Sequence, residues 1–317
     1  MSSYRPVIMG PRHAVAAGHY LAAEAGFSVL NAGGNAIDAG VAAGLAIGVL
    51  QSDIVNIAGV APIIIYSAEE DRVVTISGLG TWPAATDPEF FTREYPDSVP
   101  EGILRCIVPG APAAWIMALE RYGSMTFGEV ASASIKLARD GFAMYALMAE
   151  LLAEKAEKYA RWDANAEIYL PGGHSPKVGE NFRQEDLGRS LQHMADCEAA
   201  AGGDRIAGLR AARDAFYKGD IARKISTYHE DNGGLIRMED LASFEVEVED
   251  ALRIDVAGTK VYSCGPWCQG PMLLQIMQLL QGQNLSGMGH NSAAYIHHVT
   301  EAVKLAVADR ERWYGDP

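Results

Sequence analysis

The longest uncharged apolar stretch constrains the fold of this chain more than any other segment. Residues 39–51 read AGVAAGLAIGVLQ. The stretch is too short to cross a bilayer, because that takes about 20 apolar residues. Its small alanine and glycine side chains let other elements approach closely. We therefore expect a helix packed in the interior of a globular protein.

A second helical pattern precedes this stretch. Apolar residues recur near helical spacing between positions 21 and 30, and Gly33-Gly34 then ends the first helix. Asn35 is well placed to cap the second helix. Asp38 lies in the first turn, where the helix dipole favours a negative charge. The sequence thus predicts two helices joined by a tight break.

The rest of the chain alternates helical and strand-like patterns, which predicts an α/β (α+β) fold. The runs 63–66 and 73–76 flank a polar turn and are typical of an antiparallel hairpin. Further strands are expected at 243–248, 252–256 and 260–263. Helices are expected at 113–122, 127–140, 143–161, 185–201, 206–228, 272–280 and 293–312, with a loop at 163–179. Without a tandem repeat or a low-complexity linker, residues 1–317 are expected to form a single domain.

Composition and charge narrow the class of partner. The chain has 317 residues, 49% of them hydrophobic, and a formal net charge of −14. Because a protein this acidic repels phosphate backbones, we expect no nucleic-acid partner. We also expect no membrane, because no basic run and no signal-peptide core are found. Four cysteines are few for this length, which favours a reducing, cytoplasmic location.

Residues 263–271 read SCGPWCQGP and pose a separate question. Three residues separate Cys264 from Cys268, whereas the redox motif has two between its cysteines. No other cysteine–histidine cluster supports a zinc site. The stretch follows a predicted strand, and Pro271 suits the first turn of the next helix. Redox or metal chemistry, a pocket-forming loop and a structural turn all stay open; we expect no metal and no cofactor.

Common catalytic motifs are missing from the sequence. There is no Walker A loop, no Gly-x-Ser-x-Gly elbow and no His-Glu-x-x-His. Gly33-Gly34 follows no strand, so it does not fit a phosphate-binding loop. His297 and His298 are adjacent on a predicted helix and point to different faces, which favours ordinary helix residues over a metal pair. The final helix stops at residues 315–317, so the chain is either complete or one piece of a longer product.

Five segments, in order along nearly the whole chain, carry a resemblance to a known family. They are HYLAAEAGFSVLNAGGNAIDAGVAAGLAIGV (19–49), VPGAPAAWIMALERYGSMTFGEVASASIKLARDGF (108–142), FYKGDIARKI (216–225), DNGGLIRMEDLASFEVE (231–247) and EAVKLAVADRERWYGDP (301–317). Together they resemble the large subunit of the γ-glutamyltransferase family of N-terminal-nucleophile (Ntn) hydrolases. The absence of a signal peptide and the RPVIMGPRHAV start resemble a cytoplasmic branch that includes oxamate amidohydrolase.

This resemblance implies a mechanism that needs a second chain. Family members cleave their own precursor, and the new N-terminal Thr of the small (β) subunit is the nucleophile, with its own α-amine as base. The fold is a four-layer αββα sandwich that the small subunit completes. No catalytic residue is therefore expected in this chain. Ser2, which methionine removal would expose, is the weaker alternative nucleophile. A dimer of such heterodimers is one assembly that the resemblance allows.

The sequence departs from the family where the family binds its substrate. Of the family's glycine run, Gly59 alone survives in NIAGVAPIIIY (56–66). The family's carboxylate-binding Arg has no counterpart in SGLGTWPAAT (77–86): when the prolines are aligned on Pro83, Leu79 or a near neighbour takes its place. No Arg lies between Arg72 and Arg93. The expected substrate-binding residues are Leu79, Gly80, Thr81, Trp82, Trp267 and Gln269. A core role for Trp82 is the alternative to pocket lining.

We therefore expect the large subunit of an Ntn amidohydrolase or acyltransferase that acts on a small-molecule amide with a non-γ-glutamyl acyl group. Three alternatives stay open. The first is a true γ-glutamyl hydrolase or transpeptidase with a replaced carboxylate site. The second is an inactive binding or structural homologue, and the third is a redox or metal protein built on Cys264 and Cys268.

Overall fold

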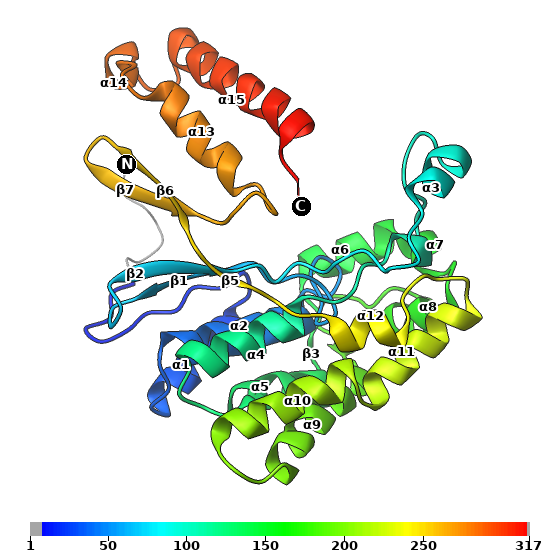
Figure 1. Cartoon of the computed structure of the whole chain (residues 1–317). Coiled ribbons are helices and arrows are strands. Elements are labelled where there is room, and N and C mark those ends of the chain that lie inside the picture. The colour runs from blue at the N-terminus through cyan, green and yellow to red at the C-terminus, as the bar shows by residue number, and fades with distance from the viewer. Residues whose placement is uncertain (1–7, 316–317) are drawn as a thin grey trace. The chain divides into compact units, whose positions relative to one another are not determined.

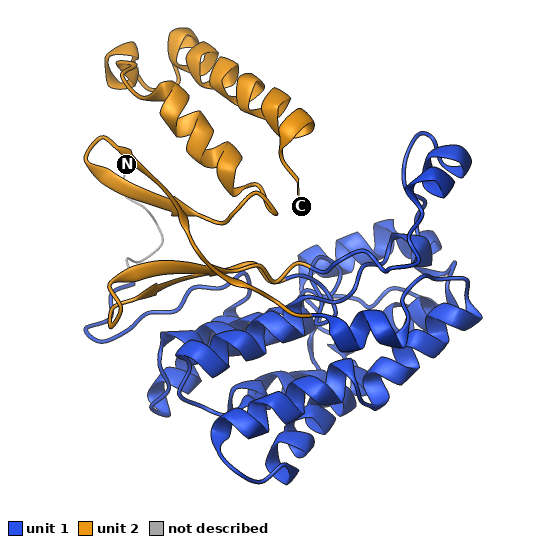
Figure 2. Ribbon diagram, viewed as in Figure 1, with its two compact units in different colours: residues 1–60, 80–244 blue, residues 61–79, 245–317 orange. Residues whose placement is uncertain are grey.

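The computed structural model describes residues 8–315. Three residues singled out from the sequence, Ser2, Asp316 and Pro317, lie outside the described residues. The chain forms two compact units (Figure 2). Unit 1 comprises Met1–Val60 and Gly80–Phe244, and unit 2 comprises Ala61–Leu79 and Glu245–Pro317. The single domain expected for residues 1–317 stays a prediction.

Unit 1 is built around the apolar helix predicted from its composition. This helix, α2 (Ala36–Leu50), is mostly buried and packs against α1 (Tyr20–Asn31) and α4 (Ala111–Tyr122). A Cβ on Gly44 would lie 2.9 Å from the indole nitrogen of Trp115 in α4. Close approach by neighbours, expected from the small side chains, is confirmed.

The predicted cap of α2 is also confirmed. Asn35 Oδ1 accepts hydrogen bonds from the backbone N–H groups of Ile37 (2.8 Å) and Asp38 (3.1 Å). Asp38 Oδ2 accepts in turn from Asn35 N at 2.8 Å. These bonds satisfy N–H groups that a helix start leaves without intrahelical partners.

Helices α5, α9 and α10 of unit 1 lie below α2 and α4 in the view of Figure 1. Helix α5 packs on α2 and α9, and α10 packs on α4 and α9. The bounds of these helices and of others in unit 1 are α3 (Pro88–Glu94), α5 (Phe127–Asp140), α9 (Glu185–Ala200), α10 (Arg205–Tyr217), α11 (Asp220–Asp231) and α12 (Met238–Ser243). Two short strands, β3 (Phe142–Ala143) and β4 (Asn181–Phe182), pair antiparallel. The 3₁₀ turns are Ile103–Arg105 and Pro171–Gly173.

Two predicted helices are each divided in the structure. The helix expected at 143–161 is α6 (Ala146–Glu154) and α7 (Ala156–Tyr159), with a break at Lys155. The helix expected at 206–228 is α10 and α11, with Gly219 between them. A Cβ on Gly219 would lie 2.7 Å from the Ala215 carbonyl oxygen, so the chain turns tightly there.

Two further segments differ from expectation. Part of the loop expected at 163–179 is helical, as α8 (Asp163–Tyr169). The strand expected at 243–248 is mostly wrong, because α12 runs to Ser243 and β5 (Val248–Asp250) starts at Val248. Asp240 Oδ2 accepts a hydrogen bond from the backbone N–H of Arg237 at 2.8 Å, which stabilises the start of this helix.

Unit 2 contains the predicted hairpin and the closing helices. Strands β1 (Ile63–Ser67) and β2 (Arg72–Ile76) pair antiparallel, and β5 adds to β2. Strands β6 (Leu252–Val256) and β7 (Thr259–Ser263) form a second hairpin. Helix α13 packs on this hairpin and on α15. The helices are α13 (Gly270–Leu280), α14 (Leu285–Met288) and α15 (Ala293–Trp313).

Across residues 8–315, every helix is too short or too polar to span a membrane.

Candidate functional site

The first predicted substrate segment is held against neighbouring backbone. A Cβ built on Gly80 would lie 1.6 Å from the Val108 carbonyl oxygen. Next to it, Val108 N donates to the Thr81 carbonyl oxygen at 2.9 Å. The two backbones are in contact at this point, so no side chain fits at position 80. The course of the segment is thereby fixed.

Trp82 projects from this segment. Its side chain lies 6.2 Å, centroid to centroid, from Phe91, and 49% of the residue is exposed. The chain after it is anchored, since Pro83 is buried and Ala84 N donates to Asp240 Oδ1 at 2.8 Å. A core role for Trp82 does not fit this exposure. Its role in lining a substrate pocket stays a prediction.

The second predicted segment is a compact turn between β7 and α13. Cys268 N donates to the Gly265 carbonyl oxygen at 3.2 Å. A Cβ on Gly270 would lie 2.2 Å from the Cys264 carbonyl oxygen. Helix α13 therefore begins in contact with the end of β7, which only a glycine at its first position allows. The strand–loop–helix order expected from the sequence is confirmed.

The two residues singled out in this turn hold it in place. Trp267 is 8% exposed, and its indole N–H donates to Glu249 Oε2 at 2.8 Å. Gln269 is exposed, and its Oε1 accepts from Arg310 Nη1 at 2.9 Å. The turn is thus fixed to β5 on one side and to α15 on the other. A buried indole with a satisfied N–H is a structural anchor.

Sequence reasoning missed Glu249 and Arg310, the partners in these contacts. They lie 18 and 41 positions from the residues they bind. Glu249 stands in no recognisable motif. Arg310 lies in the family-like segment 301–317, but nothing in that segment points to Gln269, and periodicity gives no signal for a pair so far apart. A charged residue on β5 and another near the end of a long helix resemble ordinary surface positions.

The Cys264 thiol of this turn is poorly suited to redox chemistry. Burial raises the pKa of the Cys264 thiol to about 11, and Cys268 and Glu249 act in the same direction. At neutral pH the group is therefore protonated, whereas the thiolate is the reactive form. All four cysteines are free. Among residues 8–315, no group of three or more His, Cys, Asp or Glu side chains is arranged to hold a metal ion.

The predicted site residues divide between the two units. Leu79, Trp267 and Gln269 belong to unit 2, and Gly80, Thr81 and Trp82 belong to unit 1. Within unit 1, the surviving Gly59 lies near the 107–111 backbone, because its carbonyl oxygen accepts from Gly110 N (3.0 Å) and Ala111 N (2.9 Å). The assignment of these residues to one substrate site stays a prediction.

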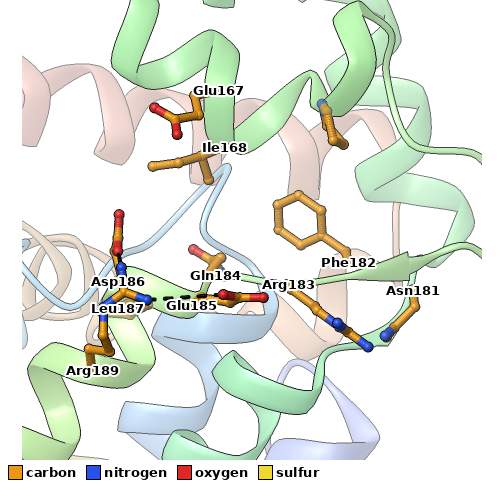
Figure 3. Close-up of a pocket in the computed structure, with 11 residues that line it drawn as sticks. Glu167, Ile168, Asn181, Phe182, Arg183, Gln184, Glu185, Asp186, Leu187 and Arg189 are labelled. Carbon is orange, nitrogen blue, oxygen red and sulfur yellow. Dashed lines mark ion pairs between the residues drawn. The ribbon is translucent and has the colours of Figure 1, made fainter.

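A separate hollow in unit 1 contains none of the predicted residues. Figure 3 shows this space of about 460 Å³, lined by α8, β4 and the start of α9. Arg189 pairs there with Glu185 and Asp186, and Arg183 Nε donates to the Asp140 carbonyl oxygen at 3.3 Å. Its charged groups thus largely engage one another or backbone, as on a solvated surface.

The fold belongs to a known structural class. The structure superposes on the crystal structure of Helicobacter pylori gamma-glutamyltranspeptidase with a TM-score of 0.89 and 29% identity, over 98% of this chain and 86% of that one. The predicted Ntn-hydrolase fold, with mixed helices and strands, is thereby confirmed.

Sequence similarity agrees with the fold. The gamma-glutamyltranspeptidase family model matches residues 22–317, and the chain belongs to this family. It is 32% identical to the acylase ACY 1 proenzyme of Pseudomonas sp. strain SE83, over 97% of this chain and 54% of the relative. It is 29% identical to the glutathione hydrolase proenzyme of Bacillus subtilis strain 168, over 99% and 52%. The chain spans about half the length of these relatives.

Proposed function

We propose that the chain is the large subunit of a self-processed Ntn amidohydrolase or acyltransferase whose acyl group is not γ-glutamyl. A small subunit from the same precursor supplies the N-terminal Thr nucleophile. The observation that carries the proposal is the family match over residues 22–317, combined with relatives named both as acylases and as glutathione hydrolases.

The surface of unit 2 supports a partner subunit. Large apolar side chains stand exposed on both hairpins and on the closing helices. Large apolar side chains exposed on several elements of one unit are what a surface covered by another chain would present. In addition, β1 and β5 are edge strands of their sheet, and such edges readily accept a further strand. The exposed side chains are Ile64, Tyr66, Leu252, Leu273, Leu279, Ile296, Leu305 and Trp313.

We infer the acyl specificity from the charge of the substrate's acyl group. A γ-glutamyl group carries a carboxylate, and the sequence holds no Arg between Arg72 and Arg93. Removing one partner of a buried charge pair costs about 2–5 kcal/mol. Because each 1.4 kcal/mol is tenfold in affinity, a γ-glutamyl substrate loses roughly 30-fold to several thousand-fold. Leu79 and Trp82 each have an uncharged, apolar side chain, which suits an uncharged acyl group.

The proposal extends to the branch of the family, the cellular location and the subunit assembly. We place the enzyme with the cytoplasmic, oxamate-amidohydrolase-like branch. Its sparse cysteines, all four of them free thiols, support a reducing compartment. A dimer of heterodimers is the assembly to look for once the small subunit is present.

The test expresses the complete precursor, with both future subunits in one chain. Mass spectrometry should find two fragments, the second beginning with Thr, and an amide screen should release ammonia or amine. Replacing that Thr with Ala should leave the precursor whole. An intact precursor with no amide turnover would instead support an inactive homologue. Self-cleavage followed by efficient glutathione turnover would support the γ-glutamyl alternative, which the glutathione hydrolase relatives favour.

A further inference from the structure

One carboxyl group of unit 1 lies in a setting that the proposed function does not use. Asp53 sits in the turn that follows α2, where Ile54 N and Val55 N both donate to the Gln51 carbonyl oxygen at 2.9 Å. Both carboxyl oxygens of Asp53 are buried, and neither accepts a hydrogen bond from another residue among positions 8–315. A buried polar group without partners is rare and calls for an explanation.

The groups around Asp53 come from three short helices and the residues that flank them. Lys155, at the break between α6 and α7, carries a positive charge that lowers the pKa of Asp53. Burial raises the pKa values of Tyr145, Tyr159 and Tyr169, and the charge of Asp53 acts in the same direction on each. Tyr169 also donates its hydroxyl to the Ser52 carbonyl oxygen at 3.4 Å. The segment from α6 to α8 therefore covers the turn.

The second half of that segment is lightly anchored. Helices α7 and α8 contain no buried residue, whereas α6 is held in the core by Met148, Ala149 and Leu152. Regions with few buried apolar contacts open at low free energy. The contacts over Asp53 therefore contribute to holding α7 and α8 closed over the turn.

We propose that Asp53 acts as a pH-sensitive latch: its neutral carboxyl group lets the α6–α8 segment (residues 146–169) close over the turn at residues 51–55, and its ionisation opens that segment. The proposal is independent of the enzymatic function above. It concerns the position of this segment and does not depend on any substrate.

The direction of the effect follows from linkage. Burial raises the pKa of Asp53 in the closed state, against a smaller opposing effect of its own backbone N–H and Lys155. In the open state the group meets water and has an ordinary pKa of about 3.9. The closed state is thus fully favoured below the ordinary pKa. Its advantage falls as the pH rises toward the raised pKa, by up to about tenfold per pH unit for one proton.

Hydrogen exchange of this chain, followed by mass spectrometry from about pH 4 upward, tests the latch. After correction for intrinsic exchange, peptides from residues 146–169 should lose protection by up to about tenfold per pH unit and then level off. Asp53→Asn, which mimics the neutral carboxyl group, should abolish this dependence and keep the segment protected. Asp163→Asn removes an exposed acid on α8 and serves as the matched control.

A second variant keeps the test independent of how well Asp53→Asn folds. Lys155→Met removes the charge that favours ionised Asp53, so protection should persist to higher pH than in the wild type. The proposal is overturned if the wild type and Asp53→Asn show the same pH dependence at residues 146–169. It is also overturned if Lys155→Met leaves the transition where it was or moves it to lower pH.

Discussion

At the scale of the residue, one buried carboxylate joins the central helix to a distant turn. Asp38 is fully buried. It accepts hydrogen bonds from Ser124 N, Ser124 Oγ and Met125 N, besides closing the cap at Asn35. Asp38→Ala should destabilise the protein by about 3 kcal/mol or more, because several donors lose a charged acceptor. Urea unfolding checks this, and an effect as small as that of exposed Asp163→Ala would contradict it.

Gly80 gives a second prediction at this scale. Gly80→Ala should destabilise the protein, since a Cβ there would meet the Val108 carbonyl oxygen at 1.6 Å and one backbone must move. Gly40→Ala is the matched control: nothing lies within 4 Å of its Cβ, and Ala in a helix is favoured by roughly 0.5–1 kcal/mol. Thermal melting should therefore move in opposite directions for the two variants. A harmless Gly80→Ala would mean that the segment is not held as described.

Residues also differ in how far the sequence predicts them. The Asn35–Asp38 cap is predictable, because its two members are three positions apart and their chemistry is local. The bonds from Asp38 to Ser124 and Met125 are not, since they join positions 86 and 87 apart. The same limit hides Glu249 and Arg310.

At the scale of the element, strong local patterns predict the structure correctly, whereas the breaks within helices escape prediction. The β1–β2 hairpin and helix α9 follow their sequence periodicity. Residues 143–161 are rich in good helix formers and contain no Gly or Pro, so nothing in the sequence signals the break at Lys155. The break at Gly219 does carry a signal, but the helical pattern on both sides obscures it. Asp163, Asn165 and Tyr169 of α8 are weak helix formers, which makes that segment resemble a loop.

The turn between β7 and α13 yields the next prediction. Because the pKa of Cys264 is about 11, its alkylation by iodoacetamide should still rise about tenfold per pH unit between pH 9 and 10. An ordinary thiol, with a pKa of about 8.5, levels off in that range. Cys268→Ser should shift the Cys264 profile to lower pH, since Cys268 helps to raise this pKa. Peptide mapping follows the site; a plateau below pH 9 would contradict the described burial.

At the scale of the whole molecule, five ordered segments of the sequence are enough to indicate the family, because long matches in order are hard to produce by chance. The family match over residues 22–317 confirms that prediction. The substrate cannot be obtained in the same way. Its proposed determinants are single side chains such as Leu79 and Trp82, and the nucleophile of the proposed enzyme lies on another chain.

The most direct measurement compares two anilides on the processed enzyme. We predict a kcat/KM at least about 30-fold lower for γ-glutamyl-p-nitroanilide than for an uncharged acyl anilide of similar length, because no Arg lies between Arg72 and Arg93 to bind the carboxylate. Leu79→Arg should narrow or reverse that ratio, while Tyr228→Arg, at an exposed position on α11, should leave it unchanged. Equal or faster turnover of the γ-glutamyl anilide by the unmodified enzyme would contradict the proposed acyl specificity.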